Sequence, residues 1–124
     1  MTLCRVTPGG FEVGFHNTPS DEALQAVSLA DRVIQAIKGA DAGPFNINFL
    51  TPFDHKEQAR SCAEERVPAE SFHWGHPKPA TIKLLKEAGC TVWGQVGNIE
   101  DARRAVGDGV DVIVAQGQEA GGHN

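Results

Sequence analysis

The residues best suited to chemistry stand together near the end of the chain, in the run QGQEAGGH (residues 116–123). An amide such as Gln116 can donate and accept hydrogen bonds, and a histidine such as His123 can move a proton near neutral pH. Gly121 and Gly122 let backbone approach a ligand closely, because no Cβ stands in the way. This combination indicates a ligand-binding loop that carries an acid–base group.

Further polar side chains follow three earlier apolar runs. Asn46 and Asn48 lie in PFNINFL, His73 lies in SFHWGHP, and Gln95 lies in WGQVGN. If these runs are parallel strands, their carboxyl ends meet at one edge, where barrel enzymes keep their ligand groups. Each residue also has a plainer interpretation: an asparagine bonded to its own turn, a histidine bonded to backbone, or an amide that finishes a strand.

The elements that must position these residues alternate along the chain. Apolar, β-branched runs predict strands over residues 45–50, 69–73, 91–96 and 110–115. Helical spacing of apolar residues predicts helices between and before them, near residues 20–39, 55–66, 77–89 and 98–107. This α-β-α-β-α-β-α-β order predicts right-handed βαβ units and a parallel sheet, either doubly wound or closed as a barrel.

Capping signals mark several helix ends. Ser20 suits an N-cap, Asp54 with Glu57 three residues later resembles a capping box, and Asn98 suits the last helix. Gly89 suits a helix end. Residues 1–19 hold several glycines and prolines, so we expect an irregular N-terminal arm on a single domain over residues 1–124.

A metal site is not expected. His73 and His76 form a His-x-x-His pair, which further residues could complete: His55, Cys62 or His123. Zinc sites require closely spaced ligand pairs, and Pro77 constrains the turn beside His76. Asp111 lies at a strand start, at the stability face of a barrel, so we interpret it as structural.

Three segments resemble one known family. GVDVIVAQGQEAGGH (residues 109–123), PFNINFL (44–50) and SFHWGHP (71–77) are similar to motifs of the nitronate monooxygenase (2-nitropropane dioxygenase) family of FMN-dependent TIM-barrel enzymes. The resemblance selects the barrel between the two parallel folds. The expected fold is therefore α/β, a partial (β/α)₈ TIM barrel of about four βα units with parallel strands.

The resemblance implies roles for particular residues. Asn48, Gln116, Gly121 and Gly122 would contact FMN, and His123 would be the catalytic histidine. His73 would contact the substrate. The implied reaction oxidises an alkyl nitronate with O₂ to a carbonyl compound and nitrite. A flavin-dependent enoyl-thioester reductase or an NAD(P)H:quinone reductase of the same superfamily would show a similar loop.

Composition excludes several other classes of protein. The net charge is −5 and no basic cluster offsets it, so nucleic acid is not an expected partner. No apolar run approaches the roughly 20 residues of a membrane helix, so no membrane partner is expected either. Cys4, Cys62 and Cys90 are odd in number and far apart, which favours a reducing, cytoplasmic setting over a disulfide framework.

Length sets a separate expectation. A closed barrel typically needs about 250 residues, and this chain has 124. We therefore expect a fragment of a larger enzyme. Four open strands would leave two edges and one face uncovered, which predicts self-association through the open half-barrel. The alternative is a truncated half-barrel without catalytic activity.

Overall fold

The computed structural model describes residues 2–5, 11–14, 21–40 and 43–120, with side chains from Ala30 onward. Its elements are β1 (Thr2–Arg5), β2 (Phe11–Gly14), α1 (Asp21–Gly39), β3 (Asn46–Leu50), α2 (Lys56–Glu64), β4 (Ala69–His73), α3 (Pro79–Glu87), β5 (Thr91–Val96), α4 (Ile99–Gly107) and β6 (Val112–Ala115). One sheet has the order β2-β1-β3-β4-β5-β6, and β3 to β6 run parallel. The alternating order and the four parallel strands of a partial TIM barrel are confirmed.

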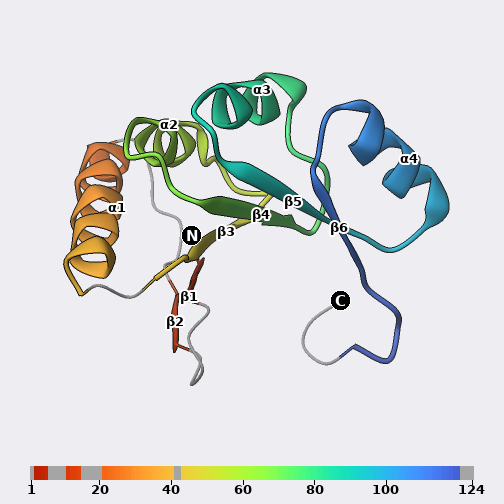
Figure 1. Cartoon of the computed structure of the whole chain (residues 1–124), viewed down its shortest axis with the longest axis horizontal. Coiled ribbons are helices and arrows are strands. Elements are labelled where there is room, and N and C mark those ends of the chain that lie inside the picture. The colour runs from red at the N-terminus through yellow and green to blue at the C-terminus, as the bar shows by residue number, and fades with distance from the viewer. Residues whose placement is uncertain (1, 6–10, 15–20, 41–42, 121–124) are drawn as a thin grey trace.

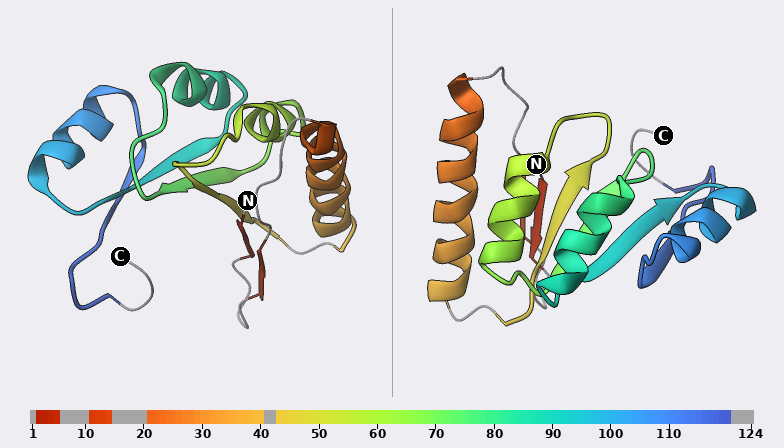
Figure 2. Two further views of the ribbon diagram at one scale, coloured as in Figure 1. Left: turned by 180° about the vertical axis from the view of Figure 1, so that it is seen from behind. Right: turned by 90° about the horizontal axis from the view of Figure 1, so that it is seen from above.

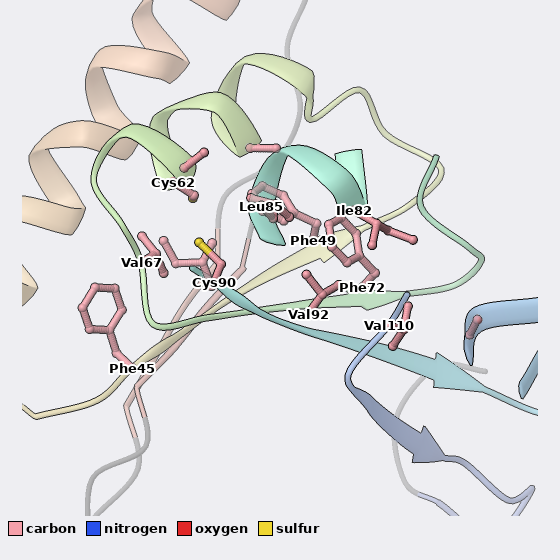
Figure 3. Close-up of a cluster of buried hydrophobic side chains, with 14 of the residues drawn as sticks. Phe45, Phe49, Cys62, Val67, Phe72, Ile82, Leu85, Cys90, Val92 and Val110 are labelled. Carbon is pink, nitrogen blue, oxygen red and sulfur yellow. The ribbon is translucent and has the colours of Figure 1, made fainter. Parts of the chain in front are cut away.

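The helices cover one face of the parallel strands (Figures 1 and 2). Phe49, Phe72 and Val92 point from three neighbouring strands into the layer under these helices, where each is at most 1% exposed. They meet Ile82 and Leu85 of α3 in one apolar cluster (Figure 3). Because strand residues alternate between faces, the residues next to them in sequence face the other way, toward the interior of the barrel fold.

The helix ends agree with the sequence signals at some positions only. The Asn98 side chain accepts a hydrogen bond from Asp101 N at 2.8 Å, as an N-cap should, and Gly89 follows α3 with a φ of +87°. The capping box at α2 is wrong. The N-cap there is His55, whose side chain makes no cap bond, and Glu57 binds Arg60 of its own helix instead, at 3.0 Å. That ion pair turns the Glu57 carboxylate away from the helix start.

The N-terminal residues differ from the expected irregular arm, because β1 and β2 are strands. β1 pairs antiparallel with both β2 and β3, and Leu3 is opposite Ile47. Pro8, Gly9 and Gly10 fall between the two strands. Residues that interrupt a strand pattern therefore stand between two short strands in the sequence. The edge of β3 supplies the hydrogen-bond partner of β1, and β1 supplies that of β2. Within the part of the chain that the structure describes, no helix is long and apolar enough to cross a membrane.

The last strand is shorter than expected at its start. Residues 110 and 111 precede β6, because Val110 N bonds to Ala105 O of α4 and Asp111 N bonds to Val92 O. Val110 is buried in the apolar cluster. The backbone N–H groups of Val110 and Asp111 therefore form the bonds that end α4 and begin the pairing with β5.

Candidate functional site

The face of the sheet opposite the helices carries a row of side chains set by strand register. Asn48 pairs with Ser71, Ser71 with Trp93, and Trp93 with Val112, from β3 across to β6. Asn48 and Ser71 are both buried. The register thus brings the predicted flavin contact Asn48 beside a hydroxyl from the next strand.

Ser71 links two amides. Its Oγ lies 2.8 Å from Asn46 Oδ1 and 2.9 Å from Asn48 Oδ1. A hydroxyl has one proton, so it can donate to only one of these amides at a time, and the second is satisfied if its NH₂ group turns toward Oγ. Within the described residues, Asn46 Nδ2 and Trp93 Nε1 are buried donors without a hydrogen-bond partner. The face therefore offers fixed amide groups and spare donors.

His73 lies one step closer to the carboxyl edge, opposite Leu50. Its carbonyl oxygen accepts a hydrogen bond from Thr51 N at 2.8 Å, so the strand end is held by backbone. Burial lowers the pKa of the half-buried His73 imidazole below its usual value. The ring is therefore neutral at pH 7, and it can donate one hydrogen bond and accept another.

The loop after β4 has unusual backbone geometry. Trp74 has a φ of +62° and Gly75 a φ of +139°. Positive φ is strained for a bulky residue, and such strain tends to gather at ligand sites. His76 Nε2 then lies 2.7 Å from Asp108 Oδ2, at the end of α4. Sequence reasoning placed His76 at a variable motif position and did not foresee Asp108, because 32 residues separate the two in the chain.

A cavity of about 340 Å³ opens at the carboxyl ends of β5 and β6. Its walls come from the β4–α3 loop, the first turns of α4 and the residues after β6. Lining residues include Trp74, Gly75, His76, Gln95, Arg104, Gln116 and Gln118. The structure thus brings Gln95 and Gln116 together as strand-end residues, and Gln116 N is held by Val96 O at 3.0 Å. Asn48 is not among the residues lining this cavity.

Arg104 was not identified from the sequence as a site residue. It stands on α4, paired with Asp101 one turn earlier, and both line the cavity. An i,i+3 ion pair is normally a solvated helix feature, so the local pattern carried no signal of a site. Gly121, Gly122 and His123 lie outside the described residues, and their roles stay predictions.

The residues considered for a metal site have different surroundings. His76 binds Asp108, whereas His55 packs on the rings of Phe49 and Phe72, with centroids 5.2 and 5.4 Å away. Cys62 is fully buried in the apolar cluster. Over the described residues, no group of three or more histidine, cysteine or acidic side chains could hold a metal ion.

Asp111 is bound into the opposite end of the sheet. Its carboxylate accepts hydrogen bonds from Lys86 Nζ and, at 2.9 Å, from Val92 N. Partial burial works against ionisation, but these two donors outweigh it and lower the pKa of Asp111. The two contacts join the residue before β6 to α3 and β5, which agrees with the structural role expected from the sequence.

Comparison with known proteins adds a family match. The family model "Nitronate monooxygenase" matches residues 23–124. A nitronate monooxygenase of Neurospora crassa is 57% identical over 131 aligned residues, which cover 94% of this chain and 34% of that protein. One from Paraburkholderia phytofirmans is 45% identical over 60 residues, covering 48% of this chain and 16% of that protein. The chain thus spans about a third or less of the length of these relatives.

Solved structures agree on the fold. FabK from Thermotoga maritima superposes with a TM-score of 0.67 at 32% identity, covering 76% of this chain and 31% of that one. Nitroalkane oxidase from Streptomyces ansochromogenes superposes with a TM-score of 0.72, covering 79% of this chain and 38% of that one. Its identity of 23% supports the fold alone.

Proposed function

This chain belongs to the nitronate monooxygenase family, and from that premise we propose that it acts as an FMN-dependent oxidoreductase on alkyl nitronates. The proposed reaction consumes O₂ and yields a carbonyl compound and nitrite. Flavin would supply the redox chemistry, and the chain would supply binding, orientation and proton transfer. The observation that carries the proposal is the buried Asn48–Ser71 pair on the barrel-interior face, 2.9 Å apart.

The residues that would hold FMN are Asn48, Gln116, Gly121 and Gly122. The described part of this set fits such a ligand. A flavin ring edge presents carbonyl and N–H groups, which an amide can match with donor and acceptor. Ser71 holds the Asn48 amide in place, so less freedom is lost when a ligand binds.

His73 would contact the substrate and His123 would act as the base. A neutral His73 suits this role, since its ring can accept or donate a hydrogen bond without the cost of burying a charge. An unperturbed histidine has a pKa of about 6.5, which suits a base that removes a proton from the carbon beside a nitro group. Free, buried Cys62 and Cys90 agree with a cytoplasmic setting, which we also propose.

The first experiment measures flavin. The purified protein is titrated with FMN, and bound FMN is read from its absorbance at saturation. Gly121→Val should abolish binding while far-UV circular dichroism stays unchanged, because a side chain would enter the space that the glycine leaves open. Equal stoichiometry in the two proteins would remove Gly121 from the proposed site. No binding by the parent would favour a half-barrel without catalytic activity.

The second experiment separates the reactions. O₂ uptake is followed with a nitronate, and NAD(P)H oxidation with an enoyl thioester or a quinone. We expect nitronate-dependent O₂ uptake with nitrite release. If NAD(P)H is oxidised with an enoyl thioester or a quinone and the nitronate gives no activity, the result would favour one of the reductase alternatives over the proposed function.

The third experiment tests the base. His123→Asn should retain FMN but lose turnover of the neutral nitroalkane by roughly 10²–10⁴-fold, the usual share of general base catalysis. Turnover of the nitronate should fall far less, because that substrate is already deprotonated. Equal losses on both substrates would contradict the base role of His123.

A further inference from the structure

The hydrogen bond between His76 Nε2 and Asp108 Oδ2, 2.7 Å long, joins two segments that lie far apart in the sequence. His76 belongs to the β4–α3 loop and Asp108 ends α4, and their side chains are only 16% and 31% exposed. Partial burial makes a charge-assisted hydrogen bond stronger than it would be in open water. The pair is therefore placed to hold the loop against α4.

The β4–α3 loop requires stabilising contacts, because its backbone is strained. Trp74 has a φ of +62°, a conformation that costs a bulky residue free energy unless its surroundings impose it. On one side the loop is anchored by the Thr51 N to His73 O bond of 2.8 Å. On the other, Pro77 is fully buried, and His76 beside it binds Asp108. The strained turn thus lies between two fixed points.

The strained turn also forms one wall of the 340 Å³ cavity. Trp74 lines this cavity and is 43% exposed, so part of its large indole ring is accessible to a ligand. Gln95 and Gln116 line the same cavity and supply polar groups. An apolar wall with a few polar groups is the usual composition of a small-molecule site.

We propose that His76 and Asp108 are a positioning pair: they hold the β4–α3 loop so that Trp74 forms a fixed apolar wall for the organic group of the substrate. We assign neither residue a part in the chemical step. The substrate class follows from the wall, which favours nitronates with a sizeable apolar or aromatic group over small ones. This ligand part rests on the proposed function, whereas the positioning of Trp74 does not.

The positioning part is tested by fluorescence without any flavin. The chain has two tryptophans, so Trp93→Phe leaves Trp74 as the single reporter. In that background, His76→Ala and Asp108→Ala should each shift Trp74 emission to the red and increase its quenching by acrylamide. Lys83→Ala is the matched control, because it removes an exposed ion pair of 3.8 Å to Glu87 on α3, and its emission should not change.

Pair action is tested by combining the variants. If the residues act through one bond, His76→Ala with Asp108→Ala should change the fluorescence no more than either variant alone. His76→Gln keeps a donor that can bond to the carboxylate, so it should restore the parent emission. Unchanged emission in both alanine variants, or additive changes, would overturn the proposal. If the alanine variants lose their circular dichroism signal, His76→Gln and Asp108→Asn replace them, and different Trp74 emission in His76→Gln would overturn it equally.

The ligand part is tested by kinetics on the flavin-loaded protein. His76→Ala should raise KM for a nitronate with an aromatic group more than it raises KM for nitroethane anion. Equal effects on both substrates would overturn the role of the wall in substrate selection. Absence of flavin binding or activity in the parent would instead contradict the proposed function and leave the fluorescence result standing.

Discussion

The two faces of the same parallel strands carry different kinds of residue. The face under the helices holds Phe49, Phe72 and Val92, which are nearly or fully inaccessible. The opposite face holds Asn48 and Ser71, which are also buried but bonded to each other. The comparison shows that burial alone does not distinguish the apolar core from the candidate site in this fold. What separates them is whether the buried atoms pack or form hydrogen bonds.

Glu70 departs from this division. It stands on the helix-facing side of β4, is 0% exposed, and neither carboxyl oxygen has a conventional hydrogen-bond partner in the described residues. Burial raises the pKa of Glu70 well above its usual value, and a contact with the Cys62 thiol opposes this only in part. Burial and the nearby Glu70 likewise raise the pKa of Cys90, to about 11, so its thiol is unreactive near neutral pH.

The largest expected effect comes from the apolar face. Phe72→Ala should lower the free energy of unfolding by about 3–5 kcal/mol, because it removes a fully buried ring and leaves a cavity. Urea unfolding followed by circular dichroism measures the loss. Phe53→Ala is the matched control, since Phe53 is 47% exposed and should cost far less. Similar losses at both positions would contradict the assignment of this face as the core.

Replacing Glu70 by an apolar residue should make the helix-facing side of the sheet more uniformly apolar and therefore more stable. Glu70→Met removes two buried oxygens that lack a conventional hydrogen-bond partner, so we expect a stability gain on the order of 1–3 kcal/mol at pH 8. The parent should also lose stability as pH rises. The unfolded carboxyl releases its proton near the ordinary pKa of 4.5, whereas the folded one retains it, so the native state binds more protons above that pH.

The pH dependence of Glu70 can be isolated. Unfolding free energies of the parent and Glu70→Gln are compared at pH 5, 6, 7 and 8, since glutamine keeps the shape but does not titrate. The difference between the two proteins should grow toward pH 8. A constant difference across this range would show that Glu70 titrates alike in the folded and unfolded states.

A helix cap gives an intermediate effect that belongs to neither face. Asn98→Ala removes the bond to Asp101 N, 2.8 Å long, and should cost about 1 kcal/mol. Asn98→Asp keeps an acceptor at the cap and should retain most of the stability. If the aspartate variant loses as much as the alanine variant, the cap bond is not the source of the effect.

On the barrel-interior face, the expected loss of stability is similar to that of the helix cap and far smaller than that of Phe72→Ala. Ser71→Ala removes the hydroxyl shared by Asn46 and Asn48, at a net cost of about 0.5–1.5 kcal/mol. FMN affinity should fall, because the Asn48 amide is no longer held. Thr91→Ala, at an exposed position lower on the same face, should leave both quantities unchanged. If Ser71→Ala lowers the free energy of unfolding as much as Phe72→Ala does, the proposed difference between the two faces is contradicted.

The sequence by itself determined the order of the elements from α1 to β6, because the spacing of apolar residues reports local periodicity. Strands over 69–73 and 91–96 match their observed bounds, and Asn48 was identified as a site candidate from its motif. The capping box at the start of α2 was wrong, since Glu57 had two possible partners and the sequence does not rank them. The two N-terminal strands were missed because β1 joins the sheet at the edge of β3, a partner distant in sequence, and β2 pairs with β1.

Only the tertiary structure decided which polar residues meet. Strand register places Ser71 between Asn46 and Asn48, and chain packing joins His76 to Asp108 across 32 residues. It also placed Glu70 among apolar side chains, where burial raises the pKa of its carboxyl. Local patterns cannot predict these contacts, because each depends on long-range pairing whose partners leave no periodic signal in the chain.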